Sequence, residues 1–141
     1  DAYAGELPVA YVQRVPGSRA TPAELAEFLQ GRIGERAAFP KEIIIVDKLP
    51  LSAVGKPLKN ALRQDAAERA FRSSVAAAIG LSLDDSRLSI SVRPHTSTGT
   101  LATIAVDCLP SQRAEFETLI KKAMAPYSMA HEIEWRTSKT N

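Results

Sequence analysis

The sequence contains few of the residues from which disulfides and metal sites are built. It has one cysteine and two histidines in 141 residues. The single cysteine, Cys108, cannot form an intramolecular disulfide, and its apolar neighbours indicate a thiol packed in the core rather than a nucleophile. Neither His95 nor His131 has an aspartate, glutamate or cysteine at a spacing typical of metal ligands, so we expect no metal site.

An excess of one charge sign and long apolar runs are also missing. Eighteen basic residues stand against sixteen acidic ones, which gives a net charge of +2, and the two signs are interspersed. Because no basic stripe is available to a phosphate backbone, nucleic acid is not an expected partner. No apolar run approaches the roughly 20 residues that span a bilayer, and the first residues lack the pattern of a signal peptide. We therefore expect a cytoplasmic protein without a transmembrane segment.

The first half of the chain has the patterns of a small α+β domain. Hydrophobic residues make up 45% of the sequence, which is normal for a packed core. Residues 8–15 suit a strand. The segment Thr21-Pro22-Ala23-Glu24 is a capping box with proline at the first helical position, and it predicts a helix that Gly34 ends. The apolar run in residues 42–47 predicts a strand that is covered on both faces.

The second half predicts the element order α-β-β-α-β. An alanine-rich helix is expected to begin at Pro57 and to end before Gly80. Because its roughly 23 residues exceed the usual helix length, we expect a break near residues 69–73. The pattern then predicts a hairpin of two strands at residues 87–93 and 101–106. A helix capped by Ser111 and a final strand at residues 131–136 are predicted to follow.

The strand at residues 42–47 has two predicted places. If it joins the later elements, it completes a β-α-β-β-α-β order, which is that of a ferredoxin-like unit. If it pairs with the first strand, the later elements form an appendage on the long helix, and we favour this arrangement. The predicted fold is then α+β, with a small sheet and helices in residues 1–68 and an α-β-β-α-β, ferredoxin-like-type extension in residues 69–141.

The strongest candidate site lies between the second strand and the long helix, in residues 49–58, which we call the lysine loop. It contains the pattern Ser52-x-x-Gly55-Lys56. Gly55 permits a close approach to a ligand or a positive φ, and the Lys56 ammonium carries three donors on a flexible stem. Such a cation suits electrostatic stabilisation of phosphoryl transfer. For a single Gly-Lys pair, however, an exposed turn lysine is the commoner explanation.

Several short segments around this loop follow one another in an order that is informative as a set. They are Gly5-Glu6, Pro8 to Val12, Pro40-Lys41, Leu49-Pro50, Ser52, Gly55-Lys56 and Leu62-Arg63. Through these matches, residues 1 to about 68 resemble the C-terminal domain of AMP-forming acyl-CoA synthetases, which belong to the adenylate-forming superfamily. The loop segment Ala53-Val54 is similar to that of bacterial fatty-acyl-CoA synthetases. The resemblance implies that Lys56 contacts the carboxylate and the α-phosphate during adenylation, and it makes Gly55 and Ser52 candidate cofactor-binding residues.

The resemblance also implies an acid–thiol ligase with ATP and coenzyme A as co-substrates and a small-molecule carboxylate as substrate. Mg²⁺ would be held mainly by an N-terminal adenylation domain of the same polypeptide, so the chain alone is expected to be inactive. An unpaired strand edge would allow a homodimer. Pro57, Lys59 and Asn60 depart from the family pattern, which commonly has isoleucine after the lysine and arginines before the Leu-Arg pair. These departures put in doubt a role of Lys59 and Asn60 in gripping a phosphate.

A second hypothesis belongs to another class of protein. In it, the later elements form a non-catalytic binding or oligomerisation module with the β-α-β-β-α-β arrangement. Arg36 and Lys41 are candidates to face adenine or coenzyme A, although solvated surface charge explains them better. Residues 96–99 form a polar turn that needs no ligand to explain it.

Overall fold

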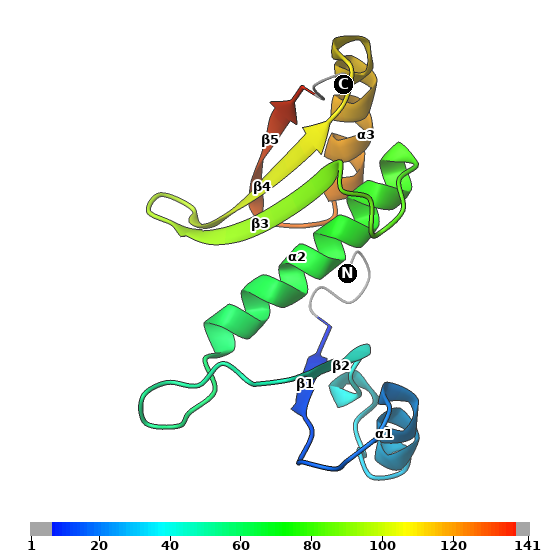
Figure 1. Ribbon diagram of the computed structural model, residues 1–141, viewed down its shortest axis with the longest axis vertical. Helices are drawn as coiled ribbons and strands as arrows, with labels where there is room; N and C mark the ends of the chain where they lie inside the picture. The colour runs from blue at the N-terminus through cyan, green and yellow to red at the C-terminus, as the bar shows by residue number, and fades with distance from the viewer. Residues whose placement is uncertain (1–6, 138–141) are drawn as a thin grey trace. The chain divides into compact units, whose positions relative to one another are not determined.

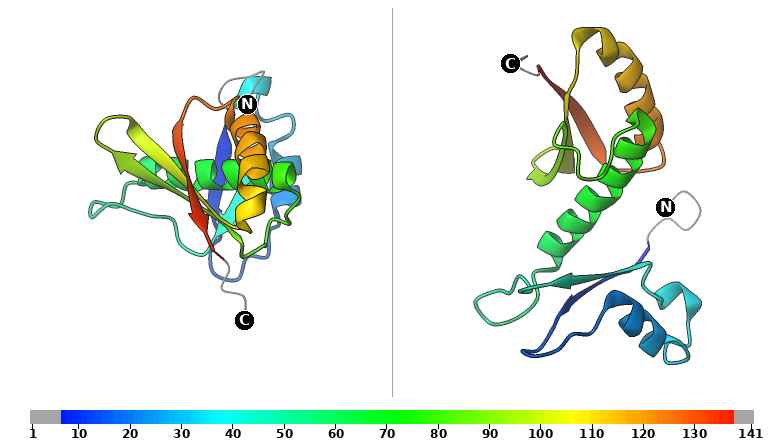
Figure 2. Two further views of the ribbon diagram at one scale, coloured as in Figure 1. Left: turned by 90° about the horizontal axis from the view of Figure 1, so that it is seen from above. Right: turned by 45° about the vertical axis from the view of Figure 1, so that its right-hand side comes forward.

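The computed structural model describes residues 7–137 (Figures 1 and 2), so the Gly5-Glu6 match lies outside the described residues. The chain divides into two compact units, residues 1–62 and 63–141. The predicted α+β class is confirmed. The elements in chain order are β1 (Val9–Gln13), α1 (Pro22–Leu29), η1 (Arg36–Ala38), β2 (Glu42–Val46), α2 (Lys59–Ile79), β3 (Leu88–His95), β4 (Gly99–Asp107), η2 (Pro110–Gln112), α3 (Arg113–Met124) and β5 (Ala130–Arg136).

The first unit is built on a parallel pair of strands. β1 pairs with β2 in a register that runs from Val9↔Glu42 to Gln13↔Val46. Ile43 and Ile44 of β2 are buried, as their apolar run predicts. Because β2 belongs to this two-stranded sheet and not to the sheet of β3 to β5, the favoured place of this strand is confirmed. The alternative β-α-β-β-α-β arrangement is not formed.

Helix α1 begins as its sequence predicts and ends earlier. The Thr21 hydroxyl accepts from Glu24 N at 3.2 Å while the Glu24 carboxylate accepts from Thr21 N at 2.7 Å, which completes the capping box. The helix ends at Leu29, and Gly31 takes the left-handed conformation with a φ of +75°. The prediction that Gly34 fills this role was therefore wrong, because the first glycine after the last helical turn already terminates the helix.

Helix α2 is one uninterrupted helix of 21 residues (Figure 1), and it begins at Lys59, after Pro57. The predicted break near residues 69–73 is absent. Phe71, Val75 and Ile79, which are buried, fall on one face of the helix across the site of the expected break. Tertiary packing of such an apolar stripe stabilises a long helix beyond its intrinsic propensity.

The second unit contains a three-stranded sheet in the order β3-β4-β5. β3 and β4 form the predicted antiparallel hairpin, and β4 pairs directly with β5 in parallel. A ferredoxin-like split β-α-β unit would instead hold a further strand between such a parallel pair. The predicted order α-β-β-α-β is confirmed. Alternate residues of β3 and β4 share one core with both helices, and this core includes Leu88, Val92, Ala102, Ile104, Val106, Phe71, Val75, Ile120 and Met124.

Two side chains of α2 connect the helix to β3 and to the loop that precedes it. Arg72 donates to the carbonyl oxygens of Leu83, Asp85 and Leu88 at 2.5, 2.8 and 2.6 Å. Glu68 accepts from Val92 N of β3 at 2.7 Å. The second bond satisfies a backbone donor of β3 outside its pairing with β4, which reduces the tendency of this edge to pair with another strand.

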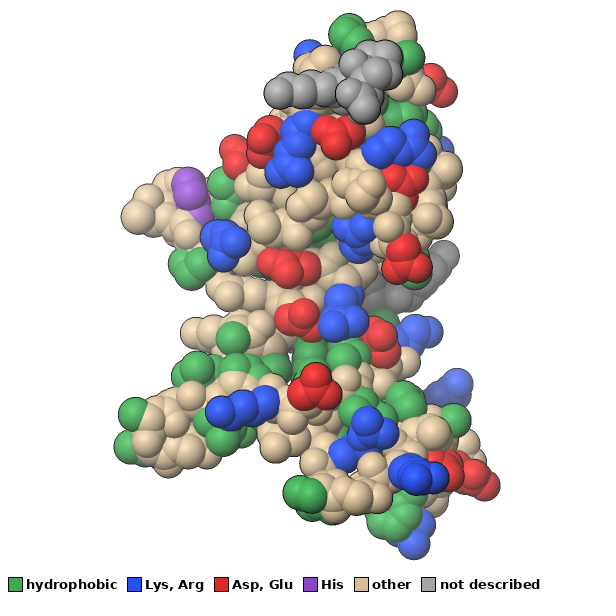
Figure 3. Space-filling view, in the orientation of Figure 1, with side chains coloured by type: hydrophobic (Ala, Val, Ile, Leu, Met, Phe, Trp, Pro, Cys, Tyr) green, Lys and Arg blue, Asp and Glu red, His purple; other side chains and the backbone are tan. Residues whose placement is uncertain are grey.

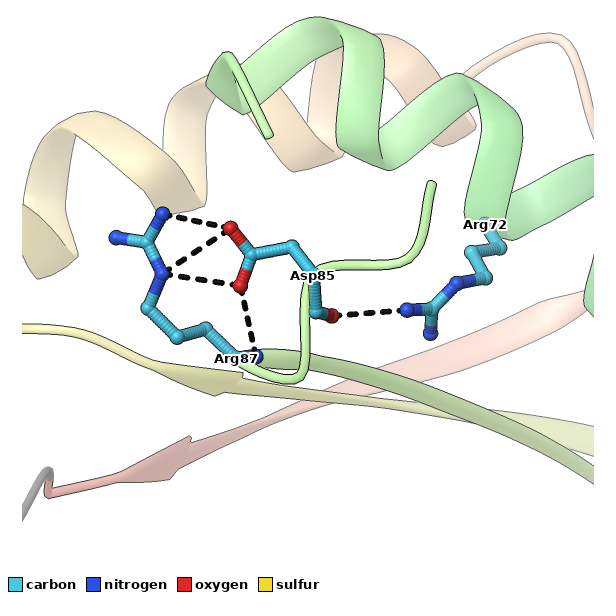
Figure 4. A network of polar contacts seen from close by, with 3 residues as sticks. All are labelled: Arg72, Asp85 and Arg87. Carbon is cyan, nitrogen blue, oxygen red and sulfur yellow. Dashed lines mark hydrogen bonds and ion pairs between the residues drawn. The ribbon is translucent and has the colours of Figure 1, made fainter. Parts of the chain in front are cut away.

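An ion pair lies beside this connection (Figure 4). Arg87 Nη2 lies 2.7 Å from Asp85 Oδ2, and Arg87 N donates to Asp85 Oδ1 at 2.9 Å. The side-chain hydrogen bond from Arg87, followed by the bond from its backbone, lowers the pKa of Asp85 to about 2. The loop before β3 is thus held by a carboxylate that stays ionised into strong acid.

Candidate lysine site

The lysine loop connects β2 to α2 and folds back on itself as a hairpin-like loop (Figure 1). Its base is closed by Leu58 N, which donates to Pro50 O at 2.8 Å. Leu51 and Pro57 form an antiparallel bridge. At the tip, Gly55 N donates to Ser52 O at 2.9 Å. These bonds make the loop a preformed β-structure, so its tip is held by its own backbone rather than by packing.

Gly55 occupies the position in the tip that requires a left-handed residue. Its φ is +77°, and a Cβ built on it would meet no atom within 4 Å. The preference for glycine here is therefore conformational and not steric, since non-glycine residues pay a cost in this region of φ. This matches one of the two roles that the sequence suggests for Gly55, while contact with a ligand stays a prediction.

Ser52 fixes the backbone of Lys56 from two sides. Its hydroxyl oxygen accepts from Lys56 N at 3.1 Å, and its own N–H donates to Lys56 O at 2.8 Å. The predicted cofactor-binding role of Ser52 stays a prediction. The geometry gives this residue another task, which is to set the direction in which the Lys56 side chain leaves the loop.

The ammonium of Lys56 is exposed and available to a ligand. Among the described residues it has no hydrogen-bond or ion-pair partner. The surrounding sequence favours the same conclusion, because residues 48–64 contain Lys48, Lys56, Lys59 and Arg63 but no aspartate or glutamate. A cation in such a place attracts anionic groups without competition from a local carboxylate.

The same loop also carries exposed apolar side chains. Val54 at the tip is 79% exposed, and Leu51 and Leu58 at the base are 46% and 45% exposed. Figure 3 shows hydrophobic side chains at the surface of this loop, at the lower left, with a basic side chain beside them. The loop therefore presents one positive charge together with exposed apolar side chains.

One residue that contacts the loop was not identified from the sequence. Gln13, the last residue of β1, accepts from Leu49 N through its amide oxygen at 2.9 Å. This bond joins the entrance of the lysine loop to the sheet of the first unit. The two residues are 36 positions apart, and a glutamine at the end of a strand carries no sequence signal for such a contact.

The remaining candidates belong to other segments of the chain. Arg36 belongs to η1 and is exposed, as is Lys41, whose backbone N donates to Pro8 O at 2.8 Å. Nδ1 of His95 lies 3.1 Å from Ser97 Oγ and 3.0 Å from Thr98 Oγ1, so this histidine stabilises its own turn.

Two further expectations concern the thiol and metal ions. Cys108 is 5% exposed and belongs to the core of the second unit, which confirms its prediction as a packed thiol. Within residues 7–137 no three histidine, cysteine, aspartate or glutamate side chains are grouped so that they could hold a metal ion. None of the helices in that range combines the length and apolar character of a membrane-spanning segment.

The fold and the loop define an α+β chain that presents one lysine on a hairpin. Residues 1–56 match the family described as the AMP-binding enzyme C-terminal domain. This match confirms the resemblance that the sequence indicates for the first part of the chain.

The chain is similar in sequence to proteins named as CoA ligases. Marinolic acid–CoA ligase of Pseudoalteromonas sp. (strain SANK 73390) is 33% identical over 141 residues, which cover 99% of this chain and 20% of that protein. Indoleacetate–CoA ligase of Aromatoleum aromaticum is 37% identical over 67 residues, which cover 48% of this chain and 13% of that protein. The solved structure of apo MatB from Rhodopseudomonas palustris is 36% identical, with a TM-score of 0.35, and the match covers 38% of this chain and 10% of that one. The chain thus spans a fifth or less of the length of these relatives.

Proposed function

We propose that this chain is the C-terminal portion of an ATP-dependent, AMP-forming acyl-CoA ligase, and that Lys56 is its adenylation lysine. The observation that carries the proposal is the Lys56 ammonium, which has no partner within residues 7–137 and stands on a hairpin at the end of the family match over residues 1–56. The names of the relatives include marinolic acid and indoleacetate, so the proposed substrate is a small-molecule carboxylic acid.

In the first half-reaction, a carboxylate oxygen of the acid attacks the α-phosphorus of ATP. The new bond joins that oxygen to phosphorus, and the bond from phosphorus to the bridging oxygen of the β-phosphate breaks. Pyrophosphate leaves and the acyl-adenylate remains. Negative charge increases on the α-phosphate oxygens and on the departing pyrophosphate, so a positioned cation stabilises the transition state more than the separated substrates. Lys56 supplies this cation with three donors, directed by the bonds from Ser52.

The expected size of the effect follows from the charges involved. At about 4 Å and an effective dielectric constant near 20, one pair of unit charges interacts by about 4 kcal/mol. If this interaction is gained only in the transition state, its removal slows adenylation by roughly three orders of magnitude. An exposed lysine without a catalytic role would give no such effect.

The second half-reaction needs other groups. The thiol of coenzyme A loses its proton to solvent as its sulfur attacks the acyl carbonyl carbon. The bond from that carbon to the AMP oxygen breaks, and AMP leaves with the electron pair of that bond. We assign nucleotide binding and Mg²⁺ mainly to an N-terminal adenylation domain of the same polypeptide. For this reason the chain alone is expected to be inactive. Lys56 would withdraw for this step, so thioester formation does not depend on it.

We retain the cytoplasmic location of the protein as part of the proposal.

The proposal is tested by separating the two half-reactions in the full-length ligase with the change Lys56→Ala. Adenylation is followed by acid-dependent pyrophosphate exchange, and thioester formation is followed from a supplied acyl-adenylate. We expect the first to be lost and the second to survive. Survival of both would contradict the assignment of Lys56.

The second unit supports a further role, as a binding or oligomerisation module attached to the ligase. It has its own hydrophobic core, and the alignment with marinolic acid–CoA ligase takes it in, because that alignment covers 99% of the chain. Removal of residues 63–141 from the ligase, followed by light scattering and by measurement of the KM for the acid, distinguishes these roles. A changed mass indicates oligomerisation, and a changed KM indicates substrate binding.

A further inference from the structure

We propose that Gln13 is a positioning residue for Lys56, acting through the entrance of the lysine loop. This inference rests on the proposed function of Lys56 and adds to it a residue outside the family's lysine motif. The observation is the bond of 2.9 Å in which the Gln13 amide oxygen accepts from Leu49 N.

The lysine loop behaves as one body because its bonds are internal. Leu58 N bonds to Pro50 O, and Ser52 bonds to the backbone N and O of Lys56. A hairpin with these closures keeps its shape but does not by itself fix its direction relative to the sheet. The place of the Lys56 ammonium therefore depends on how the base of the hairpin is attached.

The attachment on the side of the strands is made by Gln13. This residue is the end of β1, where it is opposite Val46, the end of β2. Only Asp47 and Lys48 lie between Val46 and Leu49, and both are exposed. The bond from Leu49 to Gln13 thus ties the chain to the neighbouring strand just where it leaves the sheet, and it limits the angle at which the hairpin projects.

The chemistry of this contact requires an acceptor at position 13. A backbone N–H can bond only to an acceptor, so the carbonyl side of the glutamine amide must face Leu49. Glutamate also presents an oxygen at this distance from the backbone. Methionine has a similar length and shape but offers only a weak acceptor. The two substitutions therefore separate the hydrogen bond from the volume of the side chain.

The contact is exposed, so its loss affects global stability little. Its effect is expected in the step that needs Lys56, because a small misplacement of a catalytic group slows a reaction far more than it destabilises a fold. The loss of one neutral hydrogen bond corresponds to about a fivefold change in rate. Nucleotide and acid affinities are not expected to change, since Gln13 acts only on the direction of the loop.

The experiment compares Gln13→Met and Gln13→Glu with the wild type in the full-length ligase. The matched control is Gln30→Met, at an exposed glutamine whose backbone, and not its side chain, caps α1. We expect Gln13→Met to slow pyrophosphate exchange by about fivefold or more, with the KM for ATP and for the acid unchanged and thioester formation from a supplied acyl-adenylate unchanged. Gln13→Glu and Gln30→Met are expected to retain the wild-type rate.

The double variant Gln13→Met with Lys56→Ala identifies the route of the effect. If Gln13 acts through Lys56, the double variant is no slower than Lys56→Ala alone. Hydrogen exchange at the Leu49 amide gives a readout independent of activity, and it should be faster in Gln13→Met. Three results would overturn the inference. They are a wild-type rate of pyrophosphate exchange in Gln13→Met, an equal loss of rate in both half-reactions, and additive losses of adenylation rate in the double variant. Retained adenylation in Lys56→Ala alone would instead contradict the proposed function.

Discussion

Ser52 bonds to both polar groups of the Lys56 backbone. The Ser52 hydroxyl oxygen accepts from Lys56 N at 3.1 Å, and Ser52 N donates to Lys56 O at 2.8 Å. The lysine is therefore directed by a neighbour four residues away and not by a packed core. Since residues 53–58 are exposed, small changes at Ser52 are expected to alter the direction of the ammonium without unfolding the chain.

The change Ser52→Ala removes the acceptor for Lys56 N and leaves the backbone bond to Lys56 O in place. We expect adenylation to slow by about fivefold, which corresponds to about 1 kcal/mol for one hydrogen bond, and Ser52→Thr to retain the wild-type rate. Steady-state pyrophosphate exchange measures both. A raised KM for ATP with an unchanged maximal rate would contradict this role and would favour direct contact of Ser52 with the nucleotide.

The change Gly55→Ala tests the conformational requirement of the hairpin tip. Because φ is +77° and the space around the position is open, we expect destabilisation by roughly 1–2 kcal/mol from backbone strain alone. The matched control is Gly34→Ala, where the space is equally open and φ is not positive. Denaturant unfolding measures both variants, and equal effects at the two glycines would show that the strain argument is wrong.

The three hydrogen bonds that Arg72 donates to carbonyl oxygens should contribute to the stability of the second unit. The change Arg72→Met leaves three carbonyl oxygens, those of Leu83, Asp85 and Leu88, without this donor. We expect a loss of about 2 kcal/mol in the free energy of unfolding, because hydrogen bonds from a charged donor are stronger than neutral ones. Lys121→Met, on α3, removes an exposed pair with Glu117 and should cost about 0.5 kcal/mol or less. Similar losses of unfolding free energy in the two variants would contradict this stabilising role of Arg72.

Acid should weaken the loop before β3 in a defined range of pH. Asp85 has a folded-state pKa of about 2, below the usual aspartate value of 3.8, chiefly because of its side-chain hydrogen bond with Arg87. A lowered folded-state pKa means that the ionised form favours folding, so the contribution is complete above the unfolded-state value and is lost as pH falls through about 2. Asp85→Asn should remove this part of the pH dependence. An NMR titration that gives Asp85 an ordinary pKa would contradict this predicted pH dependence.

The sequence predicted the elements whose signals are local. The capping box of Thr21 and Glu24 located the start of α1, and the alternation of Leu88, Ile90 and Val92 located β3. The lysine loop was recognised because its residues are contiguous. These are the cases in which propensity, turn chemistry and periodicity agree.

The features that the sequence did not predict depend on contacts between distant residues. The continuity of α2 follows from the burial of Phe71 and Val75 against the core of the second unit, which helix length statistics do not include. The predicted division after residue 68 and the division of the structure into residues 1–62 and 63–141 both fall within this helix. The contact of Gln13 with Leu49 is also tertiary, and only the pairing of β1 with β2 brings the two residues together.

The central claim is that Lys56 supplies the cation for adenylation, and its most direct test is the single-turnover rate of acyl-adenylate formation in the full-length ligase. Lys56→Ala is compared with Lys59→Ala, which removes a neighbouring exposed cation from the start of α2. We expect Lys56→Ala to slow this step by roughly three orders of magnitude, and Lys59→Ala to change it by less than about threefold, because screened surface charge contributes little. An unchanged rate in Lys56→Ala, or equal losses in the two variants, would contradict the claim.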